Sequence, residues 1–404
     1  MFRRGTVPGR SRAIRRLGPA LLAIAMAGCG GQAAPAPASS PASPAAASAS
    51  APAAASPASA KPAASAAAAP SASAPAGSAA APASGAARPK FKLATVGLAP
   101  EAPVYLASDK GYFADAGVDV EYAPFRGSSE VVPLLATGGL DFAPAGIDAS
   151  LFNAAQRDTG VKMLASEAVA NKEGPGGAAL VVAQSLIDSG EYKSVKDLKG
   201  KTIAVNSRGG VGEMIVEEVL ATAGLKVGDV NLQLISFPDM AGALANRKID
   251  AAYLTEPFIS IGVSKGISKV VTLAGDVHPN LIGLVLLGGS NLKSEPDAAA
   301  RFMVAYLRGL RFYYSAYFTN ANPASKQDVI DSITKHTPNR DPKAVAAMGM
   351  TGVDPNGAID QQELQKFQDY FLKAGTQKTP VPLDQVVDTS YLQAALKQLG
   401  PFKA

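Results

Sequence analysis

Short apolar runs alternate with amphipathic stretches from about residue 90 onward. The runs at 91–98, 119–125 and 141–145 have the length of strands, and the stretches at 104–116 and 129–136 have the spacing of helices. The same alternation recurs at residues 202–206, 213–223, 231–237, 240–247 and 250–255. Strands that alternate with helices of this length predict α/β units around mostly parallel sheets.

Two continuous apolar runs, Ala178–Ala183 and Leu281–Leu287, break this alternation. Each is a place where the chain can pass from one α/β block to the other. From Pro296 onward the pattern is helical, with a long amphipathic stretch at 299–318. We therefore expect an α/β fold of two lobes with two crossover segments and a helical C-terminal part. Ligands of open α/β sheets bind beyond the carboxyl ends of the strands, which here places the site in a cleft between the lobes.

The long C-terminal amphipathic stretch carries aromatic residues near helical spacing. Such a stripe belongs to the core more often than to a ligand platform. Its aromatic members are Phe302, Tyr306, Tyr313, Tyr314 and Tyr317, with the aliphatic Leu310 at the same spacing.

The first residues have the order of an export signal. A basic run ends at Arg15 and Arg16, and a short apolar stretch follows at 17–27. That stretch has about half the roughly 20 residues that a bilayer-spanning helix needs. Small residues precede Cys29, the one cysteine of the chain. We interpret 1–29 as a lipoprotein signal peptide with Cys29 as the lipidation site; an ordinary signal peptide and twin-arginine export are the alternatives.

Residues 30–88 consist mostly of Ala, Pro and Ser. Without large apolar side chains this segment buries too little surface to offset the entropy of ordering. We expect a disordered tether with an end-to-end distance of about 40 Å.

The net charge of +5 is unevenly distributed. Residues 1–88 contain eight Lys and Arg and no Asp or Glu, which leaves 30 basic and 33 acidic residues after them. The folded part is thus mildly acidic, whereas nucleic-acid binding requires a concentrated basic face. We predict no nucleic-acid partner. With Cys29 lipidated and His278 and His336 far apart in the sequence, we also predict no metal site and no cofactor.

Several segments, taken in order, resemble a known family. They are GLAPEAPVYLA at 97–107, KGYF at 110–113, GVDV at 117–120, LLATGGLDF at 134–142, VKDLKGKTIA at 195–204, KIDAAY at 248–253 and Glu256-Pro257. Together they resemble the nitrate/sulfonate/taurine-type ABC substrate-binding proteins and their thiamine-precursor-binding relatives. The resemblance covers about 90 to 400. It implies a periplasmic-binding-protein type II fold, a flytrap with residues 89–180 and 285–404 in lobe 1 and residues 181–284 in lobe 2.

The loops that follow the predicted strands supply candidate ligand contacts. Free N–H groups at helix starts and glycines that allow close backbone approach suit a bound anion. In lobe 1 the candidates are Ala102, Pro103, Gly127, Ser128, Ile147 and Asp148. In lobe 2 they are Ser207, Arg208, Gly209, Gly210 and Glu256. Ordinary helix capping is the alternative for each loop. For Glu256, contact with the ligand and capping of the following helix are equally well supported.

Arg208 can contact a carboxylate, sulfonate or phosphate, and Glu256 an amine or ring N–H. The resemblance implies import rather than catalysis. We expect an extracytoplasmic, lipid-anchored monomer that captures a sulfonate, a taurine-like or a pyrimidine-like solute for an ABC permease and ATPase. An enzyme of the thiamine-pyrimidine synthase type is one alternative, although that family has a Cys-rich motif that this chain lacks. A ligand sensor for a membrane kinase is the other.

Overall fold

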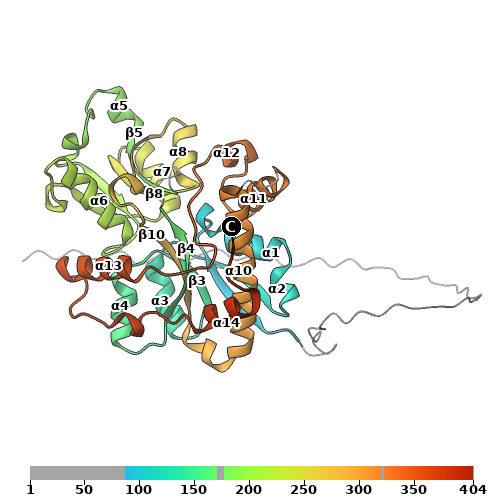
Figure 1. Cartoon of the computed structure of the whole chain (residues 1–404). Coiled ribbons are helices and arrows are strands. Elements are labelled where there is room, and N and C mark those ends of the chain that lie inside the picture. Colours follow the sequence, from blue (N-terminus) through green and yellow to red (C-terminus); the bar gives the residue numbers. More distant parts are fainter. Residues whose placement is uncertain (1–86, 171–176, 320–322, 404) are drawn as a thin grey trace, which may run out of the picture. The chain divides into compact units, whose positions relative to one another are not determined.

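The computed structural model describes residues 87–170, 177–319 and 323–403 (Figure 1). The predicted signal peptide, its Cys29 and nearly all of the tether at 30–88 lie outside these residues and stay predictions. Within the described part of the chain, no helix combines the length and the apolar character needed to cross a membrane.

The first sheet has five strands in the order β2-β1-β3-β10-β4. Its strands are β1 (Lys90–Thr95), β2 (Asp119–Pro124), β3 (Phe142–Ala145), β4 (Lys162–Val169) and β10 (Ile282–Gly288). β1 pairs in parallel with β2 and β3, whereas β10 is antiparallel to both β3 and β4. We call this sheet with its helices the first lobe.

The second sheet repeats this plan, with the order β7-β6-β8-β5-β9. Its strands are β5 (Ala178–Ala183), β6 (Thr202–Val205), β7 (Asn231–Leu234), β8 (Ala251–Thr255) and β9 (Ser268–Leu273). β6 is parallel to β7 and β8, and β5 is antiparallel to β8 and β9. This sheet with its helices is the second lobe. The expected α/β class is confirmed, with one antiparallel strand inserted into each sheet.

Helices cover both sheets. Those of the first lobe's N-terminal part are α1 (Ala102–Asp109), α2 (Tyr112–Asp115), α3 (Ser128–Ala136) and α4 (Ala149–Gln156). Those of the second lobe are α5 (Gln184–Asp188), α6 (Val211–Thr222), α7 (Phe237–Ala245), α8 (Phe258–Ser264) and α9 (Ala274–Val277). The C-terminal part contributes α10 (Pro296–Phe318), α11 (Pro323–His336), α12 (Pro342–Ala346), α13 (Gln361–Lys373) and α14 (Ser390–Leu399).

Two hydrophobic clusters divide the core between the faces of the first sheet. On one face α1, α10 and α14 pack on Phe91, Leu93 and Phe142, and Figure 1 shows α1, α2 and α10 together on this side. On the other face α3, α4 and α13 belong to a cluster that continues into the second lobe. The predicted core role of the aromatic stripe agrees with this packing, because Phe302, Tyr306, Leu310 and Tyr313 are buried in the first of these clusters.

Two details differ from the sequence pattern. The stretch expected as one helix at 104–116 is interrupted at Gly111, whose φ of 73° is readily adopted only by a residue without a Cβ. The lobe boundaries placed at 180/181 and 284/285 fall inside β5 and β10. Each apolar run is a strand that pairs within one sheet, so the chain changes sheet before Ala178 and before Ile282.

Candidate functional site

A cavity lies between the two lobes at the carboxyl ends of β1, β3, β6 and β8. It encloses about 810 Å³ of space free of protein atoms, part of it open to solvent. Both lobes line it, with Val96, Pro100 and Leu284 among the contributions of the first lobe and Asn206, Phe237 and Tyr253 among those of the second. This is the position that α/β topology predicts for a ligand.

Backbone hydrogen bonds join the lobes beside this cavity. The amide of Ala149 donates to the carbonyl of Gly209 at 2.8 Å, and the amide of Val211 donates to the carbonyl of Ile147 at 3.2 Å. Asp148 and Gly210, between these pairs, form an isolated antiparallel bridge. We call these contacts of residues 147–149 with 209–211 the interlobe bridge. At another point the amide of Ala99 donates to the carbonyl of Glu256 at 3.0 Å.

Three of the residues predicted as ligand contacts line the cavity. They are Gly127, after β2, Ile147, after β3, and Ser207, after β6. We predicted these residues because they follow strand ends. Gly146, beside Ile147, and Pro100, just before the predicted contacts Ala102 and Pro103, also line the cavity.

The other predicted contacts lie outside the lining residues, and most have partners elsewhere. Ala102 and Pro103 are buried at the start of α1. The Asp148 carboxylate caps α4 by accepting hydrogen bonds from the Ser150 amide at 3.0 Å and its hydroxyl at 2.5 Å. Glu256 caps α8, with Ser260 donating through its amide at 3.1 Å and its hydroxyl at 2.8 Å. Ordinary helix capping thus accounts for both acidic side chains.

The loop after β6 is held by Glu213, near the start of α6. Arg208 is half exposed and its guanidinium lies 3.3 Å from the Glu213 carboxylate. The amide of Gly209 donates to the same carboxylate at 2.9 Å, and Gly209 and Gly210 serve in the interlobe bridge. The side chain of Ser128 lies outside the described residues. The geometry therefore gives Gly209 and Gly210 of this loop to contact between the lobes, while Ser207 lines the cavity.

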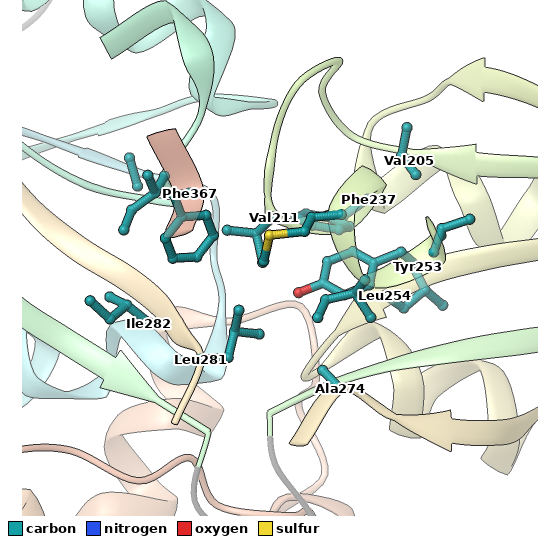
Figure 2. Packing of buried hydrophobic residues seen from close by; sticks show 14 of the residues in the cluster. Val205, Val211, Phe237, Tyr253, Leu254, Ala274, Leu281, Ile282 and Phe367 are labelled. Carbon is teal, nitrogen blue, oxygen red and sulfur yellow. The ribbon is translucent and has the colours of Figure 1, made fainter. Parts of the chain in front are cut away.

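Several lining residues carry no loop signature in the sequence. Tyr253 lies within β8, and Thr351 comes from the C-terminal part. Figure 2 shows Val211 and Tyr253 of the second lobe pointing toward Leu281, which precedes β10. Tyr253 was detectable as part of KIDAAY but not as a cavity residue, because the strand pattern does not tell which side chain reaches the strand end.

Two buried acids lie in the first lobe near the cavity wall. Glu101 is fully buried and accepts hydrogen bonds from the Thr95 hydroxyl at 2.5 Å, from the Val96 amide at 3.1 Å and from the Tyr105 hydroxyl. Glu167, on β4, is also fully buried, and neither of its carboxylate oxygens has a hydrogen-bond partner within the described residues. Burial raises the pKa of both acids, and the charge of Glu101 raises the pKa of Glu167 further.

Neither histidine lines the cavity. His278, in the second crossover, lies between Glu218 of α6 and Glu363 of α13, with Nδ1 2.8 Å from a Glu218 oxygen and Nε2 against Glu363. His336 lies 3.0 Å from Asp109 and stacks on Tyr105. Across the described ranges no group of His, Cys, Asp and Glu is arranged to hold a metal ion.

Residues 100–316 match the family described as NMT1/THI5 like. The chain belongs to the NMT1/THI5-like family. The match covers more than half of the chain and includes the interlobe bridge and nearly all of the cavity wall, leaving out only Val96, Leu98 and Thr351 among the lining residues. This family match and the fold of the solved structures described below confirm the resemblance read from the sequence.

Curated relatives are named as binding proteins. YtlA of Bacillus subtilis, named as a binding protein, is 26% identical over 297 residues, which are 71% of this chain and 84% of the relative. A B. subtilis protein named as binding aliphatic sulfonates is 24% identical over 306 residues, 74% of this chain and 86% of the relative. The riboflavin-binding protein RibY of Chloroflexus aurantiacus is 27% identical over 214 residues, 52% of this chain and 57% of the relative.

Solved structures establish the fold. The ligand-binding component of an ABC-type import system from Staphylococcus aureus superposes with a TM-score of 0.64 at 18% identity, over 76% of this chain and 99% of that one. The periplasmic nitrate-binding protein NrtA of Synechocystis PCC 6803 gives 0.62 at 15%, over 77% and 89%. The desulfurization enzyme DSZB gives 0.55 at 17%, over 77% and 99%, so the fold also supports catalysis.

Proposed function

We propose that this chain is the extracytoplasmic solute-binding component of an ABC importer, and that it holds a small organic solute between its two lobes. The observation that carries the proposal is a cavity at the carboxyl ends of both sheets, with walls from both lobes. The binding-protein relatives, which align over most of their length, support the same function.

A cavity with walls from both lobes suits a mechanism in which the lobes close around the solute. The interlobe bridge lies next to the cavity, and Ile147 and Val211 belong to both. A solute that contacts both walls binds the closed form more tightly and shifts the population toward it. The closed form then docks on a membrane permease, whose ATPase partner drives uptake.

The lipid anchor is part of the proposal. Cys29, acylated after signal cleavage, would attach the chain to the membrane, and residues 30–88 would give the lobes reach from the surface. Exchange of Cys29 for Ala is expected to move the protein from the membrane fraction to the soluble extracytoplasmic fraction. Retention in the membrane fraction would contradict lipidation at this residue.

Binding accounts for the cavity better than catalysis does. Ser207 lies on the wall and has a hydroxyl that could act as a nucleophile, but no His, Lys, Asp or Glu accompanies it among the lining residues that the structure describes. A serine needs a neighbouring base to act as a nucleophile. The wall thus offers contact surface and hydroxyl groups without an acid–base pair.

The test is a thermal-shift screen of the purified full chain against nitrate, sulfonates, amino acids, pyrimidines and flavins, with each solute recovered and analysed afterwards. A solute at a hundredfold excess over its dissociation constant stabilises the folded state by about 2.7 kcal/mol, which raises the melting temperature measurably. We expect one class to shift the transition and to be recovered unchanged. Conversion of the solute would indicate an enzyme, and the absence of any shift would contradict solute binding.

A further inference from the structure

The character of the cavity wall narrows the solute class, an inference that rests on the proposed function. Apolar side chains make up most of the wall, with Val96, Leu98, Ile147, Phe237 and Leu284 among them. Asp, Glu, Lys, Arg and His are all absent from the described lining residues. The polar side chains of the wall are the neutral ones of Asn206, Ser207, Tyr253, Thr255 and Thr351.

Ionisable side chains beside the cavity have partners, except Glu167, for which burial raises the pKa and favours the neutral acid. Arg208 pairs with Glu213, and the carboxylates of Asp148 and Glu256 cap α4 and α8. The starts of α4 and α6 are also engaged, because the amides of Ala149 and Val211 donate to carbonyls of the opposite lobe. An anion or cation enclosed here would give up its hydration without gaining a charged partner among the described residues of the wall, which is unfavourable.

Tyr253 provides a hydrogen-bond donor directed at the solute. Its side chain comes from β8 and is 5% exposed, yet its hydroxyl has no hydrogen-bond partner among the residues that the structure describes. In Figure 2 the hydroxyl oxygen points toward Val211 and Leu281, into the space between the lobes. Burial raises the pKa of Tyr253, so the phenol keeps its proton and donates. The hydroxyl oxygen is not among the fully buried atoms that lack a partner, so it stays accessible from the cavity, where a solute acceptor would bond to it.

The ring of Tyr253 is fixed against the start of α6. A Cβ on Gly212 would lie 2.7 Å from a ring carbon of Tyr253, so only glycine permits this approach. The same helix start places Val211 on the cavity wall. This packing limits where the ring of Tyr253 can lie, which favours a directed contact from its hydroxyl.

We infer that the cavity selects an uncharged solute with an apolar, aromatic or heterocyclic body and a hydrogen-bond acceptor, such as a carbonyl oxygen, that receives the Tyr253 hydroxyl. Sulfonates, nitrate and taurine do not meet this description. The contact from Tyr253 fixes the orientation of the solute, and the apolar wall encloses its body.

The test uses probes that share one ring and differ in charge. Benzamide is neutral, benzoate anionic and benzamidine cationic at pH 7.4, and benzenesulfonamide with benzenesulfonate gives a second neutral and anionic pair. Binding to the purified full chain is measured by isothermal titration calorimetry. We expect each neutral probe to bind at least tenfold more tightly than its charged counterparts. Charged probes that bind as tightly would overturn the inference and leave solute binding intact.

Tyr253→Phe removes only the hydroxyl. We expect it to weaken binding of the neutral probes about fivefold or more, because one buried hydrogen bond is lost. Tyr192→Phe, a matched loss of a hydroxyl from the second lobe outside the cavity wall, should leave affinity unchanged. Equal affinities of Tyr253→Phe and the native chain would overturn the assigned contact. If no probe of any charge binds and the wider solute screen is also negative, the proposed function itself fails.

Discussion

The amide of Val211 and the carbonyl of Ile147 form a hydrogen bond of 3.2 Å between residues of different lobes. Ile147 follows β3 and Val211 begins α6, and both side chains line the cavity. The residues that hold the lobes together are thus the residues that would enclose a solute. Changes at the interlobe bridge should alter affinity, even where they do not touch the solute.

Gly210→Ala tests this link. A Cβ at Gly210 would lie 2.2 Å from the Ser207 hydroxyl oxygen and 3.5 Å from the Asp148 Cβ, so Ser207 must move from its place on the wall. Rotation of the Ser207 hydroxyl relieves this clash at little cost to stability, and because a polar contact of the wall is then lost we expect solute affinity to fall about threefold by calorimetry. Gly242→Ala in α7, where no atom lies within 4 Å of the added carbon, is the control. Equal affinities of the two variants would contradict the role of the bridge.

Gly309→Ala should lower stability through the packing of α10 on α1. The added Cβ would lie 2.2 Å from the carbonyl oxygen of Pro103 and 3.1 Å from the Ala107 Cβ. We expect a loss of about 1–3 kcal/mol in the free energy of unfolding, measured in denaturant. Gly242→Ala should instead be neutral or stabilising, because alanine is favoured within a helix. An unchanged midpoint for Gly309→Ala would show that the two helices separate easily.

His278 should make stability depend on pH in the alkaline range. Hydrogen bonds that its ring N–H groups donate to the carboxylates of Glu218 and Glu363 raise its pKa to about 9, from an unfolded value of about 6.5. A group whose folded pKa is raised stabilises fully below its unfolded pKa, and this contribution disappears as pH rises through the folded pKa. We expect the native chain to lose on the order of 2 kcal/mol between pH 6.5 and 9.5 relative to His278→Gln. Parallel pH profiles of the two proteins would refute this.

Glu167→Gln should show a pH effect over a lower and wider window. Because burial raises the folded pKa of Glu167, the native chain binds a proton that the unfolded chain releases above about pH 4.3. Its stability relative to the neutral variant should therefore fall as pH rises from 5 to 8. Denaturant unfolding at both pH values measures the difference. A constant difference would mean that the folded state already tolerates the ionised carboxylate.

The sequence predicted the fold well because it depends on periodicity. The runs at 119–125 and 250–255 contain β2 and β8, and the stretch at 299–318 lies within α10. The lobe boundaries were less accurate, since an apolar run that crosses between lobes and a central strand have the same composition. Only the pairing of β5 and β10 distinguishes the two.

The candidate site was predictable only in part. Gly127, Ile147 and Ser207 line the cavity because strand-end position can be read from a pattern. Arg208 and Glu256 satisfied the same rule, but whether a charged side chain faces a ligand or a neighbour depends on local geometry, as Glu213 and Ser260 show. Tyr253 and Thr351 needed the folded chain, because nothing in their own segments marks them as cavity residues.

The place of β10 in the first sheet has a consequence for the order of folding. The second lobe is one continuous stretch of sequence, from β5 to α9, and it can assemble as soon as that stretch is available. The first sheet leaves a gap between β3 and β4 that only β10 fills. During synthesis, which starts at the N-terminus, β3 and β4 present unpaired edges until β10 is available, and such edges favour aggregation. The first lobe, which is the first to be synthesised, is thus the last to complete its sheet.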